Sequence, residues 1–541
     1  MAYQQESYLF NAGALGHIEG LTVTSNGKAA IRYFGGIPYA LPPIGPYRFR
    51  TPRQLPLHNR YGTLVNPGRF TGGAGICPQP PNRNPPDPTL FDENCLQLNI
   101  WIPAEDAPKG DWPVLFYIHG GYLQWGSPNW SPIALAPLLS DSAFEGIVVM
   151  PAYRLNALGF LTGKELADEA RNDGDQPVGN IGFWDQRTAL EWTHKNIVHF
   201  GGNPANITVG GYSAGALSAF QQLAHELYHI PALDAIIKRL FMFSNSSGVQ
   251  AKNLEHHQKQ FDEYITKLGI PLDLEGKEKL AKLRDMPYQR LIDVQNEMKI
   301  SEYRALSDGV FYPHTLIDDI NSGDFAARMK NRSITLINGE CRDEHTMYHN
   351  WRTPENSYNS VYERLCAEYT DTVAQKLMDQ YCHRTQSLPC IYRSWQELFG
   401  HIYADIQVHH LERGFHNALF KGGLKPGKDV LRYRFDRRLK CVDATVPPSW
   451  EVTHSTDVLI WFWGTDYTPG MSEQEKEWLK GWNEGFAAFV KGDTVNWGPT
   501  KPLDMRRWRS DGETDVWEDD RWEQGLEVWN LVNGEKEKAS L

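Results

Sequence analysis

Short apolar runs separated by longer stretches of mixed polarity recur along the chain. The runs lie at residues 114–118, 146–150, 207–209, 240–243 and 334–337. Continuous apolar runs of this length are typical of strands that are buried on both faces of a parallel sheet. Helical stretches lie between them. The pattern therefore predicts an α/β fold, with a mostly parallel central sheet and helices on both of its faces.

Other patterns predict the local structure around this sheet. Two β-rich runs flank Asn26–Gly27, a pair that suits a type I′ turn, so residues 21–34 are predicted to form a hairpin. Helices are predicted at 255–268, 280–299, 358–381 and 395–420. We expect them to belong to helical insertions, roughly 255–330 and 345–420, over the carboxyl edge of the sheet. No linker rich in Pro, Gly or Ser divides the chain, which predicts one domain over residues 1–541.

Composition and charge narrow the functional class. Of the 541 residues, 41% are hydrophobic and 22% are charged, which excludes a wholly disordered, collagenous or coiled-coil chain. The net charge of −12 argues against nucleic acid as the main partner. No apolar run reaches the roughly 18 residues of a membrane span. The first residues lack the features of a secretory signal, so we expect a cytoplasmic protein, or a secreted one if a signal was removed.

One short motif points to a nucleophile. Residues 211–215 are Gly-Tyr-Ser-Ala-Gly, a G-x-S-x-G pattern between a predicted strand and a predicted helix. In that context the tight turn exposes the Ser213 hydroxyl, and the helix N-terminus favours a developing oxyanion. The alternative is an ordinary strand–turn–helix corner. A serine hydroxyl needs a base and an orienting acid, in the chain order Ser, acid, His.

Further segments resemble the type-B carboxylesterase family, which includes cholinesterases, fungal lipases and the non-catalytic neuroligins. The resemblance is carried by residues 34–40 (FGGIPYA), 93–101 (ENCLQLNIW), 180–186 (NIGFWDQ) and 196–204 (NIVHFGGNP), which precede the serine motif in the family's order. It implies an α/β-hydrolase fold and the hydrolysis of a small-molecule ester through an acyl-enzyme. It implies neither a cofactor nor a metal.

The same resemblance implies a Ser–Glu–His triad. Ser213 is the nucleophile, and Glu344, just beyond the apolar run 334–337, matches the family's acid. The residues alone do not separate Glu344 from Asp343 or Glu340. His454 matches the family's histidine and is expected to act as general base and then general acid.

The family's oxyanion hole is matched by the backbone N–H groups of Gly121, Tyr122 and Ala214. Many relatives have a small residue where Tyr122 stands, so its ring is expected to narrow the pocket. Gly120 precedes these donors and is expected to support the site.

Two other residues beside the triad depart from the family pattern. Many relatives carry Glu where Tyr212 stands, so attraction to cationic substrates is expected to be weak. Asp457 stands where the family usually has Glu. It is expected to lie next to the triad without contacting the substrate.

Cys77 and Cys95 match the family's first disulfide, with two reduced thiols as the alternative. The loop between them has little apolar surface and no Trp, which favours soluble esters over oil droplets or choline esters. Eight residues are candidate pocket walls, with core packing as the alternative: Leu123, Trp125, Trp184, Phe243, Phe311, Trp395, Phe399 and Trp463.

These observations predict a serine ester hydrolase that acts on soluble, neutral esters with aromatic or medium-sized groups. Acyl transfer, or the forming or opening of a lactone, would use the same triad and is the first alternative. A neuroligin-like interaction protein is a remote alternative, because that class lacks an intact triad.

Overall fold

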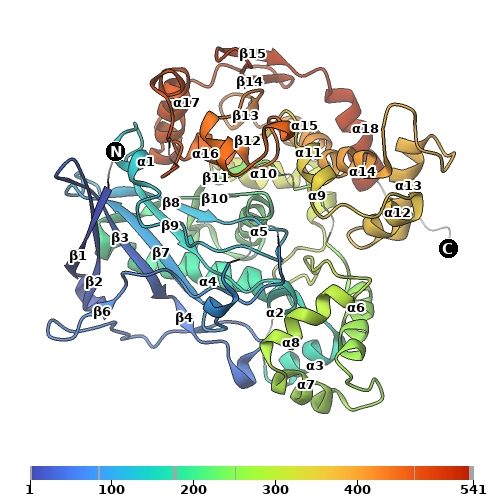
Figure 1. Cartoon of the computed structure of the whole chain (residues 1–541), viewed down its shortest axis with the longest axis horizontal. Coiled ribbons are helices and arrows are strands. Elements are labelled where there is room, and N and C mark those ends of the chain that lie inside the picture. The colour runs from blue at the N-terminus through green and yellow to red at the C-terminus, as the bar shows by residue number, and fades with distance from the viewer. Residues whose placement is uncertain are drawn as a thin grey trace.

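A mixed sheet runs through the computed structural model, which describes residues 3–82, 86–174, 179–245, 247–249, 251–467 and 469–534 (Figure 1). The strands follow one another across the sheet in the order β1 (Tyr3–Asn11), β2 (His17–Ser25), β3 (Lys28–Pro38), β7 (Gln97–Pro103), β9 (Ile147–Pro151), β8 (Trp112–Ile118), β10 (Gly202–Tyr212), β11 (Ile237–Phe243), β12 (Thr335–Cys341), β13 (Val430–Phe435), β14 (Asp504–Trp508) and β15 (Thr514–Glu518). From β9 to β14 all neighbours are parallel, and the strands at both ends are antiparallel. The predicted mostly parallel sheet is confirmed.

Short strands and the helices complete the architecture. β6 (Gly68–Arg69) pairs with β2, while β4 (Ala40–Leu41) and β5 (Arg53–Gln54) pair with each other. The helices are α1 (Ala136–Ser140), α2 (Asn156–Phe160), α3 (Lys164–Asn172), α4 (Ile181–Asn196), α5 (Ala214–His229), α6 (Leu254–Lys267), α7 (Gly276–Asp285), α8 (Tyr288–Asp293), α9 (Leu316–Ser322), α10 (Asp324–Asn331), α11 (His345–Asn350), α12 (Tyr358–Cys366), α13 (Asp371–Cys382), α14 (Trp395–Ala404), α15 (His410–Lys421), α16 (Thr456–Trp461), α17 (Glu473–Lys491) and α18 (Trp522–Asn533).

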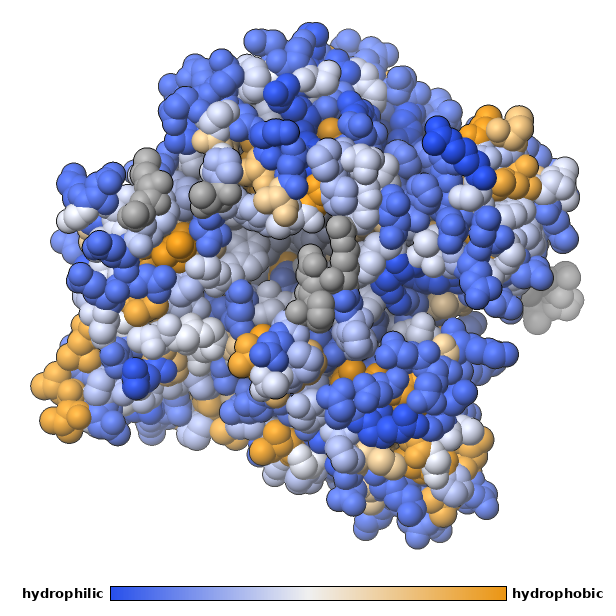
Figure 2. Space-filling view, viewed as in Figure 1, coloured by the Kyte–Doolittle hydropathy of each residue, from blue (hydrophilic) through white to orange (hydrophobic). Residues whose placement is uncertain are grey.

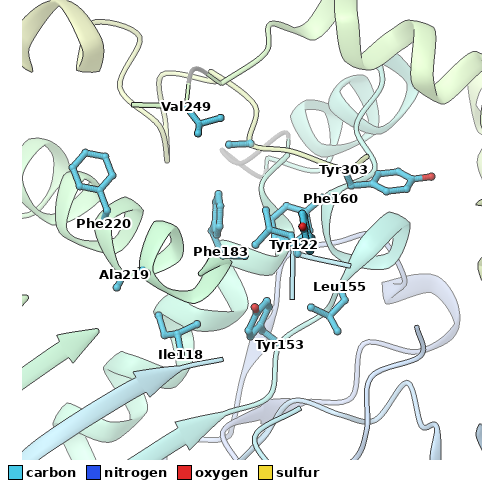
Figure 3. Close-up of a cluster of buried hydrophobic side chains, with 14 of the residues drawn as sticks. Ile118, Tyr122, Tyr153, Leu155, Phe160, Phe183, Ala219, Phe220, Val249 and Tyr303 are labelled. Atoms are coloured by element: carbon cyan, nitrogen blue, oxygen red, sulfur yellow. The ribbon is translucent and has the colours of Figure 1, made fainter. Parts of the chain in front are cut away.

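The central strands are buried on both faces. Along β8, Val114, Phe116 and Ile118 join one core, whereas Leu115 and Tyr117 join the other. The first core includes side chains of α4 and α5, and Figure 3 shows Ile118 gathered there with Phe183 and Phe220. The second core includes side chains of α16 and α17. A strand covered on both sides must be apolar throughout, which explains the continuous runs in the sequence.

The predicted hairpin is confirmed. β2 and β3 pair antiparallel, with Ser25 opposite Lys28. Between them Asn26 and Gly27 have φ of 51° and 76°, the left-handed conformation that a type I′ turn requires at both positions.

Two of the predicted helices are broken. The segment predicted as one helix over 280–299 ends at Asp285, because Met286 is extended before Pro287, and α8 begins after the proline. The segment 358–381 is interrupted between α12 and α13, where Thr370 caps the second helix. The segment 395–420 is helical throughout, and a π-helical stretch at Asp405–His409 joins α14 to α15.

Cys77 and Cys95 are joined by a disulfide. Residues 83–85 of the loop that it closes lie outside the described part of the chain. Among the described residues, no helix has the length and hydropathy needed to cross a membrane. The face in Figure 2 is mostly hydrophilic, and it is hollowed near its centre.

Candidate active site

Ser213 lies in a strained turn between β10 and α5. Its φ of 55° and ψ of −128° are unfavourable for a residue with a side chain, and its N–H donates to the Phe243 carbonyl at 2.9 Å. A Cβ on Gly215 would lie 2.0 Å from the Ile118 carbonyl oxygen, so only glycine fits there. The strand, the turn and the flanking glycines thus hold the Ser213 side chain at the carboxyl edge of the sheet.

A hydrogen-bonded chain links Ser213 to two residues distant in sequence. His454 Nε2 lies 2.9 Å from Ser213 Oγ, and His454 Nδ1 lies 2.5 Å from Glu344 Oε2. Because a carboxylate only accepts, Nδ1 carries the proton and Nε2 accepts from the hydroxyl. His454 and Glu344 are fully buried. A serine, an imidazole and a carboxylate in this order have the geometry that can activate a serine hydroxyl as a nucleophile.

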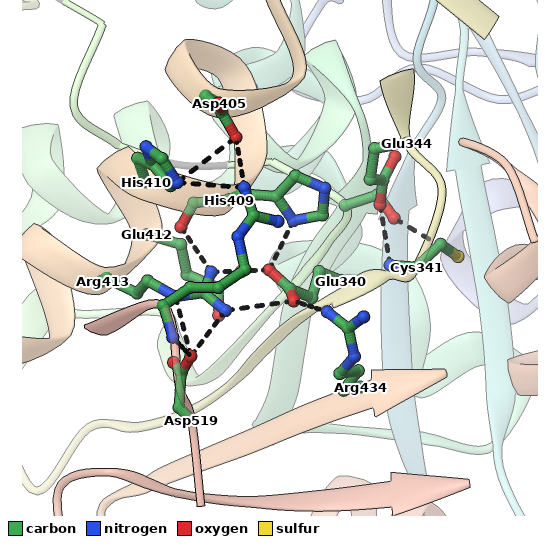
Figure 4. Close-up of polar contacts among 12 residues, drawn as sticks. Glu340, Cys341, Glu344, Asp405, His409, His410, Glu412, Arg413, Arg434 and Asp519 are labelled. Atoms are coloured by element: carbon green, nitrogen blue, oxygen red, sulfur yellow. Dashed lines mark hydrogen bonds and ion pairs between the residues drawn. The ribbon is translucent and has the colours of Figure 1, made fainter. Parts of the chain in front are cut away.

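Glu344 and its acidic neighbours Glu340 and Asp343 have different environments, and Figure 4 shows those of Glu344 and Glu340. The second carboxylate oxygen of Glu344 accepts from the Cys341 N–H at 2.8 Å. Glu340 instead pairs with His409 at 2.6 Å, with Arg413 at 2.8 Å and with Arg434. Burial opposes ionisation of Glu340, but the Arg413 and Arg434 guanidinium groups and the hydrogen bond with His409 hold its pKa well below its usual range. Glu340 is thus part of an ion-pair network. Of the three acids, only Glu344 contacts His454.

The third acid, Asp343, also bonds to groups other than the imidazole. It accepts from the Val452 N–H at 3.1 Å and pairs with Arg342 at 2.9 Å. Asp343 therefore ties the Glu344 segment to the segment that carries His454.

The loop after β8 places free N–H groups beside Ser213. A Cβ on Gly120 would lie 3.0 Å from the Ser213 Cβ, so the loop approaches the serine closely. Gly121 and Tyr122 have φ of 112° and 59°. Among the described residues, none accepts a hydrogen bond from the N–H of Gly121, Tyr122 or Ala214. Three unoccupied donors near a serine hydroxyl suit a developing oxyanion.

Two tyrosines flank the imidazole of His454. The centroid of the Tyr212 ring lies 4.9 Å from the centroid of the imidazole ring, and the centroid of the Tyr348 ring lies 5.1 Å from it. The Tyr348 hydroxyl is 3.3 Å from Nε2 and 3.4 Å from Nδ1. Sequence reasoning missed Tyr348, although its place four residues after Glu344 on a short helix was a usable signal.

Asp457 is buried behind the triad but does not contact His454. It accepts from Ser244 Oγ at 2.7 Å and from the Tyr433 hydroxyl at 2.8 Å. Burial, and then the charge of Glu344, raise its pKa from 3.8 to about 6. Its direct partners are therefore Ser244, which follows β11, and Tyr433 of β13 rather than the histidine.

Replacing Asp457 with Asn should change how stability depends on pH. The folded protein holds this proton more tightly than the unfolded chain does. The contribution of Asp457 to the free energy of unfolding should therefore fall as pH rises from about 4 to about 6, and it should not recover above that range. Asp457→Asn should lessen the fall, whereas the exposed Asp106→Asn should not. Urea unfolding at several pH values measures this, and parallel curves for Asp457→Asn and the wild type would contradict it.

A small cavity of about 20 Å³ lies against Ser213. Its walls are Tyr122, Leu123, Ser213, Ala214, Leu217, Asn245, Val249, Arg304, Tyr348, Tyr403 and Gln407. Of the eight wall residues proposed from the sequence, only Leu123 is among them. Others pack elsewhere: Phe243 stacks on Trp461 and Phe311 on Phe183. Within the described residues, no group of three or more His, Cys, Asp and Glu side chains is arranged to hold a metal ion.

Comparisons with known proteins agree with this architecture. The family model described as the carboxylesterase family matches residues 10–538. A carboxylic ester hydrolase of Gibberella moniliformis is 59% identical, over 98% of this chain and 97% of its own. An uncharacterised esterase/lipase of Schizosaccharomyces pombe is 38% identical, over 97% of this chain and 96% of its own.

A solved structure of PNB esterase matches with a TM-score of 0.70 and 22% identity, covering 96% of this chain and 99% of that one, which confirms the predicted α/β-hydrolase fold. The chain therefore belongs to the carboxylesterase family, and it is an enzyme of the carboxylic ester hydrolase class.

Proposed function

We propose that the protein is a serine esterase that cleaves soluble esters through an acyl-enzyme. The observation that carries the proposal is the chain of hydrogen bonds from Ser213 Oγ through His454 to Glu344. A neutral imidazole that accepts from the hydroxyl removes its proton as the oxygen attacks the ester carbonyl. The Glu344 carboxylate then stabilises the imidazolium that forms.

The carbonyl oxygen becomes an oxyanion in this step. The N–H groups of Gly121, Tyr122 and Ala214 are the proposed donors, and each such donor contributes about 3 kcal/mol in the transition state. His454 then protonates the leaving alcohol, and the acid part stays on Ser213. A water molecule activated by His454 releases the acid and restores the serine.

Neutral esters with aromatic or medium-sized groups are the proposed substrates. Among the described residues that line the cavity, Arg304 is the only charged one, and aromatic and aliphatic side chains make most of the wall. Tyr212 occupies the position beside the nucleophile with an uncharged ring. No carboxylate of the wall therefore attracts a cationic group. We also propose that residues 1–541 form a single domain.

Partitioning between water and an added alcohol tests the acyl-enzyme. Phenyl, p-nitrophenyl and benzyl acetates would each be hydrolysed in dilute methanol, and acetate and methyl acetate would be measured. A common acetyl-enzyme predicts the same product ratio from all three esters. A ratio that depends on the leaving group would contradict it. Methyl acetate in large excess over acetate would instead favour acyl transfer as the main reaction.

Replacing Tyr122 with Gly should admit bulky esters. The Tyr122 residue carries an oxyanion donor, so its ring stands close to the ester carbonyl, where the tertiary carbon of a bulky alcohol would crowd it; glycine tolerates the φ of 59° while keeping the N–H. Tert-butyl acetate should be cleaved at least about tenfold faster by the variant than by the wild type. n-Butyl acetate is the control and should change far less. An unchanged ratio of the two rates would contradict this role for the ring.

A further inference from the structure

The cavity beside Ser213 is small enough to limit the substrate. Its volume of about 20 Å³ holds about one water-sized group. Leu217, one helical turn after Ser213 on α5, and Val249 form an apolar part of the wall, and both are buried. A methyl group fits in such a space, whereas a longer chain must displace a wall.

The position of the cavity indicates which part of the ester enters it. Two of the proposed oxyanion donors, Tyr122 and Ala214, line it together with Ser213, whereas His454 does not. The leaving oxygen has to face His454 Nε2 to be protonated. The carbon chain on the other side of the carbonyl therefore points toward Leu217 and Val249.

A buried ion network holds the polar side of this wall. Arg304 Nη1 donates to the Tyr122 carbonyl at 2.8 Å, and its Nη2 pairs with Glu368 at 2.8 Å. Glu368 also pairs with Arg364 at 2.6 Å and accepts from the Tyr403 hydroxyl.

These groups come from separate parts of the chain. Tyr122 lies in the loop after β8 and Arg304 in the segment before α9. Arg364 lies in α12, Glu368 just after it, and Tyr403 in α14. Moving Tyr403 or Arg304 outward would separate buried charges from their partners, which is costly. The wall is thus fixed rather than adaptable.

The polar groups of Arg304 are already engaged. Its Nε also donates to Glu368 at 3.2 Å, and its remaining contacts are to Tyr303, Glu302 and Tyr403 at 3.4 Å. It has no uncommitted donor for a substrate carboxylate. The wall therefore recognises a short apolar group rather than an acidic one.

We propose that this enzyme selects esters of acetyl-sized acids. The length of the acyl chain is limited by Leu217 and Val249 on one side of the cavity and, on the other side, by Arg304, which its ion pairs hold in place. The proposal rests on the serine esterase function proposed above. It places the aromatic or medium-sized part of the substrate on the alcohol side.

Two ester series test the acyl limit. With p-nitrophenyl esters, kcat/KM should fall at least about tenfold from acetate to butyrate and further to hexanoate. With acetates of methyl, butyl and benzyl alcohol, kcat/KM should vary much less. Butyrate and hexanoate esters cleaved within about threefold of acetate, or a strong preference for methyl esters of long acids, would overturn the proposal.

Wall variants connect the limit to named residues. Leu217→Ala should raise the butyrate-to-acetate ratio of kcat/KM about tenfold or more, and Val249→Ala should raise it in the same direction. Leu223→Ala is the matched control, because it removes the same atoms from a buried position of α5 that does not line the cavity. Equal ratios for Leu217→Ala and Leu223→Ala would overturn the assignment.

Failure of the esterase function itself gives a different result. No ester of either series would then be cleaved, and a fluorophosphonate would not label Ser213. Labelling together with rapid cleavage of long acyl esters refutes the acyl limit alone.

Discussion

Replacing Ser213 with Ala should lower kcat for p-nitrophenyl acetate by about 10⁴-fold or more. The variant loses the atom that forms the acyl-enzyme, while the oxyanion donors and His454 remain. The change removes one oxygen from a side chain that is 8% exposed, so the melting temperature should stay close to that of the wild type. Steady-state kinetics and thermal unfolding measure the two effects.

Ser218→Ala is the matched control for this change. Ser218 is buried on the same helix and accepts a hydrogen bond from Gln186 at 3.1 Å, but it does not line the cavity. Its loss should affect stability more than activity. If Ser213→Ala retained more than about a hundredth of the wild-type kcat, the hydroxyl would not be the nucleophile.

Replacing Glu344 with Gln should lower kcat by about 10⁴-fold with little change in KM. An amide cannot stabilise the imidazolium as a carboxylate does. It also allows the proton of His454 to sit on Nε2, where it faces Ser213. The side chain keeps its size, so the Cys341 N–H retains an acceptor. Steady-state kinetics of the folded variant and of the wild type at several pH values measure kcat and KM.

Asp343→Asn is the control for Glu344→Gln. Asp343 is the adjacent carboxylate in sequence, but it bonds to Val452 and Arg342 rather than to His454. Its amide variant should keep kcat within about tenfold of the wild type. A larger loss of kcat in Asp343→Asn than in Glu344→Gln would mean that the acid had been assigned to the wrong residue.

The elements at the centre of the fold could be predicted because local pattern and tertiary environment agree there. The run 114–118 is apolar throughout, since β8 contacts a core on each face. The turn at Asn26–Gly27 is set by local backbone preference alone. The segment 280–299 is mostly helical as predicted, but it is divided before Pro287, because the residue before a proline avoids the helical conformation.

The candidate site was predictable only where it depends on motifs. The G-x-S-x-G turn and the family segments pointed to Ser213, Glu344 and His454, and the structure brings these side chains together. Arg304 and Tyr403 carry no local signal, because they reach the cavity through packing of the segment before α9 and of α14. Aromatic residues in sequence do not reveal which core they join, and of the eight candidate wall residues Leu123 is the one that lines this cavity.

Labelling with a fluorophosphonate shows directly whether Ser213 is an activated nucleophile. The wild type, Ser213→Ala and Ser218→Ala would each be treated with the reagent, and intact mass would be measured. An activated Ser213 predicts one stoichiometric adduct on the wild type and on Ser218→Ala, and none on Ser213→Ala. An adduct on all three proteins, or on none of them, would contradict the assignment of Ser213 as the nucleophile.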